Sequence, residues 1–166
     1  YTPEEIIRRF KYVKPAYQFR SNFGYSNMGY ITAGEVVAKI SGKTWQKFVE
    51  TEIFKPLGMK SSVTSYQQLK RKSKIASPHY EALNKDDKVV LKPLDWHHND
   101  AIDAAGSIIT SPKDITHWMQ LQLNRGIYKN KRLFSENTSK KMWTAHNRVP
   151  IPPATKENPS HLMSYG

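Results

Sequence analysis

The chain has 166 residues, 38% of them apolar and 24% charged, so it is long enough to bury a core and lies outside the composition of disordered chains. Its 26 Lys and Arg outnumber its 14 Asp and Glu and give a net charge of +12, which favours anionic partners. The absence of cysteine excludes disulfides, thiolate metal sites and cysteine nucleophiles, and no apolar run reaches the length of a membrane span.

The first residues form a capping box, Thr2-Pro3-Glu4-Glu5. The Thr2 hydroxyl can accept from the Glu5 N–H, and the Glu5 carboxylate can reach back. This pattern predicts a helix from Pro3 to about Val13, which Lys14-Pro15 ends because the residue before a proline avoids the α region. Residues 16–24 are predicted as extended or irregular chain leading into Tyr25.

Two further helices are predicted next. Apolar residues recur at helical spacing from Asn27, and Gly42 follows where a helix C-terminus favours glycine. A second helix is predicted after its cap Thr44, and Pro56 and Gly58 end it. The apolar positions that we expect to face a core are Met28, Ile31, Val36, Val37 and Ile40 in the first helix and Trp45, Phe48, Val49 and Ile53 in the second.

Residues 61–100 are predicted mostly as loop, with one short strand around Val89-Val90-Leu91. Ser111-Pro112 then opens a helix, with a cap followed by a first-turn proline, and residues 124–126 close it. A shorter helix is predicted from Ser135 through Trp143, and the prolines between Val149 and Pro159 predict a loop. The side chains of these helices expected in the core are Ile115, Trp118, Met119, one of Leu121 and Leu123, Met142 and Trp143.

Tyr25-Ser26-Asn27 lies between an extended segment and the start of a helix, where side chains can be held rigidly beside a cleft. Residues two apart on an extended chain point the same way, so the Tyr25 phenol can move a proton while the Asn27 amide donates to a substrate carbonyl. A free phenol has a pKa of about 10, so Tyr25 needs a nearby cation to act as a base. The motif alone also fits a structural role, with Tyr25 a half-buried aromatic and Asn27 an N-cap.

Two blocks of sequence resemble the β-lactamase-related serine hydrolases, a penicillin-recognising family that includes class C β-lactamases and D-Ala-D-Ala carboxypeptidases. The first block comprises Phe23 to Tyr30, Gly34 to Val37, Ile40-Ser41-Gly42, Phe48-Val49 and Ile53 to Met59. The second comprises Ala104-Ala105-Gly106-Ser107, Ser111-Pro112-Lys113-Asp114, Trp118-Met119 and Leu123-Asn124-Arg125-Gly126. Gly106-Ser107 departs from the Gly-Gly that is usual in the family.

The resemblance implies a fold class and a reaction. The implied fold class is a mainly α fragment of the α/β β-lactamase/transpeptidase-like fold, with residues 1–166 as one helical region and most of the antiparallel sheet absent. The implied reaction is acyl transfer through a serine acyl-enzyme, and the catalytic residues that carry over are Tyr25 and Asn27. Residues 144–166 would be a proline-rich loop that leads into a strand beginning at Tyr165-Gly166.

The other catalytic motifs of the family are not found in this sequence. The family has a Ser-x-x-Lys nucleophile upstream of Tyr-x-Asn, and a Lys-Thr-Gly or His-x-Gly motif downstream. Five serines are candidates for the nucleophile of the first motif: Ser77, Ser107, Ser111, Ser135 and Ser139. None of them has a lysine three residues later. Gly42-Lys43-Thr44 is followed by Trp45 instead of glycine. We therefore expect both motifs outside residues 1–166 and expect the chain alone to be inactive.

Other functions and partners are considered beside serine hydrolysis. His97-His98 with Asp100 and Asp103 could hold zinc or iron, but adjacent histidines on a strand point to opposite faces, which favours a surface loop. The resemblance implies no metal or organic cofactor, a small-molecule or peptide substrate, and a periplasmic or other extracytoplasmic location. An alternative of a different class is a non-catalytic module that binds peptidoglycan or another anionic cell-wall polymer. Nucleic acid is disfavoured, because no known nucleic-acid-binding pattern accompanies the basic residues.

Overall fold

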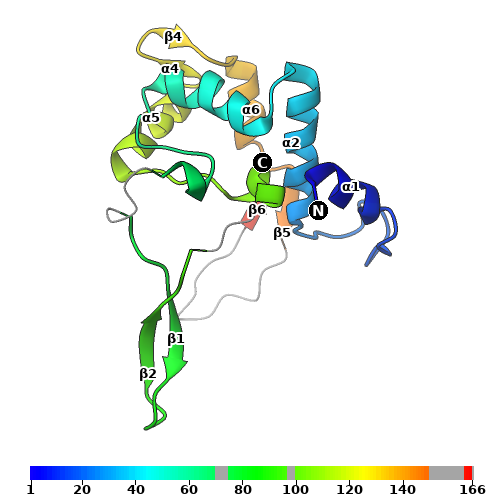
Figure 1. Ribbon diagram of the computed structural model, residues 1–166. Coiled ribbons are helices and arrows are strands. Elements are labelled where there is room, and N and C mark those ends of the chain that lie inside the picture. The colour runs from blue at the N-terminus through cyan, green and yellow to red at the C-terminus, as the bar shows by residue number, and fades with distance from the viewer. Residues whose placement is uncertain (70–74, 97–99, 150–162, 166) are drawn as a thin grey trace.

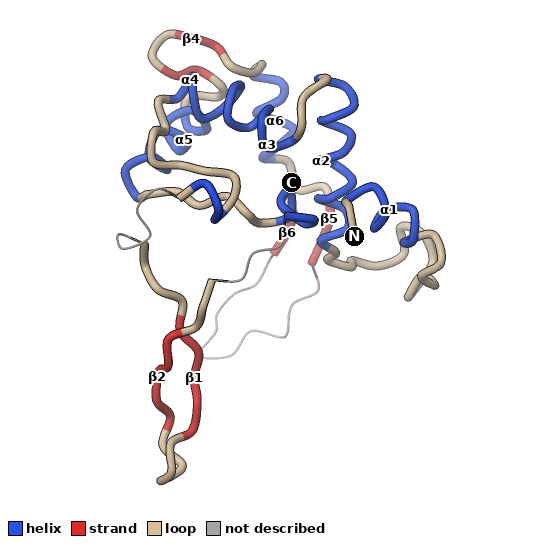
Figure 2. Tube along the Cα trace, in the orientation of Figure 1, coloured by secondary structure: helices blue, strands red, loops and turns tan. Residues whose placement is uncertain are grey.

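The computed structural model describes residues 1–69, 75–96, 100–149 and 163–165. The helices and the loops between them form one body, and one β-hairpin extends away from it (Figure 1). Figure 2 shows that the remaining strands are short pairs beside the helices. The regular secondary structure of the described residues is therefore mainly helical, as predicted.

Helix α1 (Pro3–Phe10) begins with the predicted capping box, in which the Glu5 N–H donates to the Thr2 hydroxyl at 3.2 Å and the Thr2 N–H donates to the Glu5 carboxylate at 3.4 Å. It ends three residues before the predicted Val13, with Lys11 as its C-cap. Tyr12 and Val13 are exposed, so no packing of their side chains stabilises a helical conformation at these two residues.

Helix α2 (Asn27–Ser41) agrees with the prediction at both ends. Ser26 is its N-cap and accepts from the Met28 N–H at 3.2 Å, so Asn27 is the first helical residue and not the cap. Gly42 ends the helix with a φ of 68°, a left-handed conformation that glycine adopts without strain.

The predicted second helix is one continuous segment made of α3 (Trp45–Phe48), the π-helix η1 (Val49–Phe54) and α4 (Lys55–Leu57). Thr44 caps it and Gly58 ends it, as predicted. The π-helix was not predicted: the Lys55 N–H donates to the Glu50 carbonyl, five residues back. Pro56 has no N–H and its ring crowds the carbonyl four residues earlier, and the wider turns accommodate both effects.

The core lies where this segment meets helix α5 (Pro112–Leu123) and strand β3 (Ile127–Tyr128). Its buried apolar side chains are Val49, Phe54, Leu57, Met59, Leu121 and Tyr128, and Trp45, Ile53, Trp118, Leu133 and Phe134 pack against them. Gly126 turns the chain from α5 into β3 with a φ of 90°, and a Cβ atom there would clash with the Phe134 carbonyl. Glycine is therefore required at this turn.

Residues 61–100 contain more structure than predicted. The expected strand is β2 (Val89–Pro93), and it pairs antiparallel with β1 (His79–Leu83), which was not predicted. Leu83 pairs with Val89 next to the turn, and His79 pairs with Pro93 at the other end. Two 3-10 helices, η2 (Tyr66–Gln68) and η4 (Asp100–Ala105), lie on either side of the hairpin in the sequence.

The last described elements follow β3. Strand β4 (Lys131–Arg132) pairs with β3, and helix α6 (Glu136–Trp143) has the predicted cap Ser135. Strand β5 (Asn147–Val149) pairs with β6 (Met163–Tyr165), so Val149, which was predicted as loop, ends a strand. The prolines of the predicted loop lie outside the described residues.

Several apolar side chains that were expected in the core are exposed. On α5 the exposed fractions are 37% for Ile115, 53% for Met119 and 72% for Leu123, while Leu121 is buried. The other exposed side chains that were expected inside are Val36, Ile40, Met142 and Trp143. Helical spacing identified a broad apolar face, and only part of it packs within the described residues. No helix among the described residues is long and apolar enough to cross a membrane.

Candidate active site

The Tyr25-Ser26-Asn27 element lies at the N-terminus of α2. Ser26 points its side chain into the helix end as the cap, and its two neighbours lie at the surface, with Tyr25 57% exposed and Asn27 exposed as well. The rings of Tyr25 and Tyr30 are neighbours, with centroids 5.9 Å apart. Two details of the structural alternative are therefore wrong: Asn27 is not the N-cap, and Tyr25 is more than half exposed.

The Ala104-Ala105-Gly106 segment lies beside the same helix, because η4 packs against α2. At the contact, a Cβ atom on Gly34 would lie 2.5 Å from the Ala104 Cβ, so the two backbones approach more closely than a larger side chain allows. Gly34 follows Asn27 by seven residues, which is about 10 Å along a helix. A cavity of about 250 Å³ borders this contact, and residues of α2, α3 and η4 line it.

Asp103 ties η4 to the segment that follows α2. Its side chain is 5% exposed, and the Gln46 amide donates to its carboxylate at 2.8 Å. A buried carboxylate needs such a donor, because burial without one costs several kcal/mol, of the order of a lost hydrogen bond or more. Among the described residues, no group of three potential metal ligands occurs, and His97 and His98 lie outside them. Asp103 therefore has a structural role in this part of the chain.

Ser107 joins the end of η4 to residues 63–65. Its hydroxyl oxygen lies 2.5 Å from the Thr64 carbonyl oxygen and 2.9 Å from that of Asp103. An isolated β-bridge between Val63 and Ile109, with hydrogen bonds of 2.9 and 3.0 Å, continues the same junction. Glycine, the usual residue of the family motif here, could not form the hydroxyl contacts.

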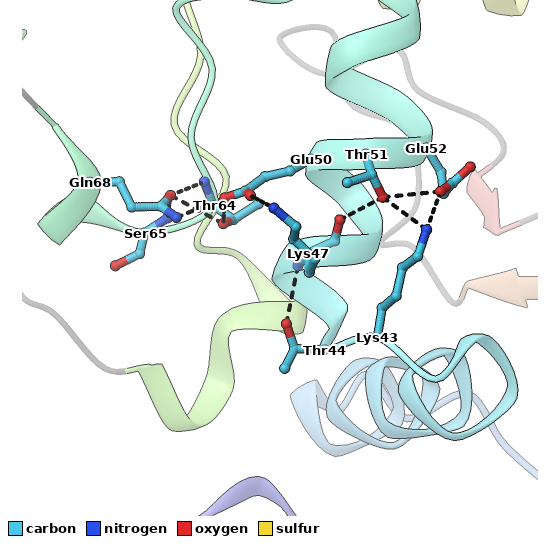
Figure 3. A network of polar contacts seen from close by, with 9 residues as sticks. All are labelled: Lys43, Thr44, Lys47, Glu50, Thr51, Glu52, Thr64, Ser65 and Gln68. Atoms are coloured by element: carbon cyan, nitrogen blue, oxygen red, sulfur yellow. Dashed lines mark hydrogen bonds and ion pairs between the residues drawn. The ribbon is translucent and has the colours of Figure 1, made fainter.

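Thr64 belongs to a network of polar contacts that reaches the π-helix (Figure 3). The Thr64 N–H donates to the Gln68 side-chain oxygen at 3.0 Å, and the Gln68 amide donates to the Glu50 carboxylate at 2.7 Å. Glu50 also lies 3.9 Å from the Lys47 ammonium. Together with Ser107, these contacts hold η1, η2 and η4 in one arrangement.

A neighbouring ion pair joins Lys43 and Glu52 (Figure 3). Hydrogen bonds from Lys43 and from the Thr51 hydroxyl hold the pKa of Glu52 below its ordinary value of 4.5. Thr44 accepts from the Lys47 N–H at 3.2 Å as the cap of α3. The Lys43-Thr44 sequence therefore has a structural explanation at the end of α2.

Asp114 fixes the residues after α4 to the start of α5. Its side chain is 4% exposed and accepts from the Ser61 N–H at 2.7 Å and from the Ser62 hydroxyl at 2.8 Å. Its own N–H donates to the side chain of the N-cap Ser111 at 3.2 Å. These contacts hold the start of α5 in place, together with residues 106–111, which join η4 to α5.

Two adjoining hollows lie near the end of η4. A cavity of about 550 Å³ is lined by Tyr66 of η2, by Trp96, and by residues 102, 103 and 105–110. A larger one of about 930 Å³ shares Trp96, Ile109 and Thr110 with it. Trp96 stacks on Tyr66, with ring centroids 5.4 Å apart and planes at 14°. Both volumes fall in the range of about 300–1,000 Å³ that is typical of small-molecule sites.

The sequence singled out Tyr25, Asn27 and the segment at 104–107, but it did not indicate the side-chain pairs at and around η4. The pairs found only in the structure are Asp103 with Gln46, Ser107 with Thr64, and Tyr66 with Trp96. The partners are far apart in the sequence, so no local spacing signals their contact.

Comparisons with known proteins bear on the family and the fold of the chain. The family model described as Beta-lactamase matches residues 1–163. Among curated proteins, the chain is similar to the N-acetylmuramyl-L-alanine amidase of Bacillus subtilis, with 26% identity over 137 residues, which cover 74% of this chain and 31% of that protein.

Solved structures with a similar fold belong to related kinds of protein. The octameric penicillin-binding protein homologue from Pyrococcus abyssi is similar with a TM-score of 0.67 and 25% identity, over 91% of this chain and 32% of that one. A D-stereospecific amidohydrolase from Streptomyces sp. gives a TM-score of 0.72 and 21% identity, over 99% of this chain and 44% of that one. The chain thus spans less than half of the length of each of these proteins.

Proposed function

We propose that this chain, which belongs to the beta-lactamase family and forms the mainly α part of the β-lactamase/transpeptidase-like fold, supplies one wall of the active site of a serine hydrolase. The observation that carries the proposal is the surface position of Tyr25 and Asn27 on either side of the cap Ser26, on a helix packed against η4. The proposed substrates are amides, peptides or esters, and an amide bond next to a D-amino acid is the first to test, because the Streptomyces relative is a D-stereospecific amidohydrolase.

In the proposed reaction, a serine oxygen attacks the substrate carbonyl carbon and its proton passes to the leaving group as the C–N or C–O bond breaks. Tyr25 carries that proton, and the Asn27 amide donates a hydrogen bond to the substrate. Water then hydrolyses the acyl-enzyme and restores the serine. The nucleophile would come from a Ser-x-x-Lys motif outside residues 1–166, and the chain alone would be inactive.

The test uses a protein that contains residues 1–166 together with a Ser-x-x-Lys motif. A fluorophosphonate or a fluorescent penicillin should label its serine, and Tyr25→Phe should slow the labelling by at least about 100-fold, the usual scale for loss of a general acid or base. Tyr30→Phe is the matched control, because Tyr30 adjoins Tyr25 but lies outside the motif. Equal labelling rates for Tyr25→Phe and the unchanged protein would contradict the proposed role of Tyr25 in proton transfer.

A second candidate function is a binding module for peptidoglycan or another anionic cell-wall polymer, and an uneven charge distribution favours it. Residues 43–60 and 125–143 carry ten Lys and Arg against three Glu. Both segments pack around the same core, and Lys131 is close enough to Glu52 to lower the pKa of that carboxyl. They therefore form one strongly basic region, which we call the basic face.

The basic face is tested by sedimentation of the chain with peptidoglycan and with teichoic acid at rising salt. Binding should weaken steeply with salt. A Lys55→Glu, Lys129→Glu, Lys141→Glu variant should lose it, whereas Lys11→Glu, Lys85→Glu, Lys88→Glu, with the same charge change elsewhere, should retain most of it. Equal retention by the two variants would exclude this function.

A further inference from the structure

A hydrogen-bonded turn lies shortly before the proposed catalytic element. The Ser21 N–H donates to the Gln18 carbonyl at 3.1 Å, and the Ser21 hydroxyl donates to the same oxygen at 2.8 Å. Arg20, the third residue of the turn, has a φ of 61°, a left-handed conformation that costs free energy for a residue other than glycine. The turn folds the chain back, so that Tyr17 on one side of it meets Gly24 on the other.

The Tyr17 side chain fills the space beside the Gly24 backbone. A Cβ atom on Gly24 would overlap the Tyr17 hydroxyl oxygen and lie 2.7 Å from the ring carbon Cζ. Both approaches are shorter than a van der Waals contact, so a side chain at position 24 and Tyr17 in this place exclude each other. Gly24, unlike Gly42, has no left-handed φ. The contact with Tyr17, and not the backbone conformation, therefore requires glycine here.

Tyr17 differs in this respect from the aromatic residues around it. Its side chain is 39% exposed, compared with 77% for Tyr12 and 88% for Phe19. These two residues face solvent for most of their surface, while Tyr17 is covered by the chain that it contacts. Tyr17 is therefore the aromatic residue of this loop that packs.

The contact adjoins Tyr25, which follows Gly24 directly. On the opposite side, the Tyr25 ring lies against the ring of Tyr30, with centroids 5.9 Å apart and planes at 46°. Tyr17 thus constrains the peptide before Tyr25, and Tyr30 constrains the ring. Together the two contacts define the direction of a phenol that is 57% exposed.

Resting on the proposed function, we propose that Tyr17 is a positioning residue for Tyr25: it fixes the backbone at Gly24 and thereby the direction in which the Tyr25 phenol points. A group that moves a proton must lie within hydrogen-bond reach of the atoms that lose and gain it. A displacement of about 1 Å can lower the rate by about 100-fold. Tyr17 itself touches no reacting atom in this scheme and acts only through the chain before Tyr25.

The test uses a protein that contains residues 1–166 with a Ser-x-x-Lys motif, and follows labelling of its serine over a range of concentrations of a fluorescent penicillin. Gly24→Ala should lower the labelling rate at saturation by about 10- to 100-fold and change the half-saturating concentration by less than about twofold, because the chemical step is affected and binding is not. Tyr17→Ala should lower the same rate by about five- to tenfold.

The two substitutions should not be additive. With Tyr17→Ala present, Gly24→Ala meets no obstacle, so the double variant should label as fast as Tyr17→Ala alone. Tyr17→Phe keeps the ring against Gly24 and should label almost as fast as the unchanged protein. Tyr12→Ala is the matched control, since it removes an exposed aromatic ring from the same stretch of chain and should leave labelling unchanged.

A second measurement follows the Tyr25 ring without any reaction. In the 166-residue chain, nuclear Overhauser contacts between the rings of Tyr25 and Tyr30 should weaken in Gly24→Ala and return in the double variant with Tyr17→Ala. Ring contacts that persist in Gly24→Ala overturn the positioning role, as does a double variant that labels more slowly than Gly24→Ala. Failure of the proposed function is a separate result, because Tyr25→Phe would then label as fast as the unchanged protein, whatever the ring contacts show.

Discussion

Gly34 and Ala104 approach so closely that a Cβ atom on the glycine would lie 2.5 Å from the Cβ of the alanine. This contact sets the distance between α2, which begins at Asn27 just after Tyr25, and η4, which borders the cavity lined by Tyr66 and Trp96. A side chain at position 34 would push the two apart. The geometry of the candidate site therefore depends on a residue that bears no functional group.

Gly34→Ala should destabilise the chain by about 1–3 kcal/mol, the usual cost of overpacking at a tight contact. Gly29→Ala is the control in the same helix, because nothing lies within 4 Å of a Cβ atom there. Alanine at that exposed helical position should stabilise by up to about 1 kcal/mol through its higher helix propensity. Urea unfolding followed by circular dichroism measures both values, and equal effects of the two substitutions would contradict the close contact.

Asp114→Ala should cost at least about 2 kcal/mol, because hydrogen bonds to a charged group are worth about 1.5–3 kcal/mol each and the Ser61 N–H and Ser62 hydroxyl would lose their acceptor. Asp114→Asn keeps the shape and one oxygen, so its cost should be smaller. Asp87→Asn, in the exposed hairpin turn, should change the free energy of unfolding by less than about 0.5 kcal/mol. A negligible effect of Asp114→Ala in the same urea series would show that the residues after α4 are held by other contacts.

Ser107→Ala removes the hydroxyl that contacts the carbonyl oxygen of Thr64, a residue with no exposed surface. The expected loss is about 1–2 kcal/mol, the scale for a buried polar group that loses its partner. Ser21→Ala removes a hydroxyl that donates to the Gln18 carbonyl at 2.8 Å but is exposed, and it should have almost no effect. If the two substitutions cost the same, Ser107 does not fasten η4 to residues 63–65.

The pH dependence of stability should include a loss in acid from two exposed carboxylates, Glu52 and Glu136, that form ion pairs. Hydrogen bonds from Arg125 and Lys140 hold the pKa of Glu136 below its ordinary 4.5, and Lys43 does the same for Glu52. A lowered pKa in the folded state means that the carboxylate stabilises the fold above pH 4.5, and that this contribution disappears as the pH falls through the lowered pKa. Arg125→Gln should move the pKa of Glu136 back toward 4.5 in an NMR titration of the carboxyl carbon, whereas Lys113→Gln should not. An unchanged Glu136 titration in Arg125→Gln would contradict the pairing.

The sequence predicted the helix starts because each depends on atoms a few residues apart. Thr2, Ser26, Thr44, Ser111 and Ser135 each accept from a backbone N–H two or three residues further on. Gly42 and Gly58 end their helices in the left-handed conformation for an equally local reason. The Tyr25 and Asn27 motif was found in the same way, from neighbouring residues and their resemblance to a family.

Burial was predicted less well, because helical spacing defines a stripe but does not say which part of it will be covered. Val49, Leu121 and Trp118 face the core as expected, while Met119 and Leu123 are exposed. Strand β1 was missed for a related reason. His79-Tyr80-Glu81-Ala82-Leu83 has no marked alternation, and its pairing with β2 makes it a strand.

By itself, the sequence determined the helix starts and the family, and it singled out the two candidate catalytic residues, since these follow from contacts and patterns within a few positions. Only the tertiary structure decided how η4 meets α2 at Gly34, how Asp103, Ser107 and Thr64 fasten it, and how Trp96 reaches Tyr66. Those contacts join residues far apart in the chain. Their formation depends on the whole fold bringing the backbones together, which no local pattern encodes.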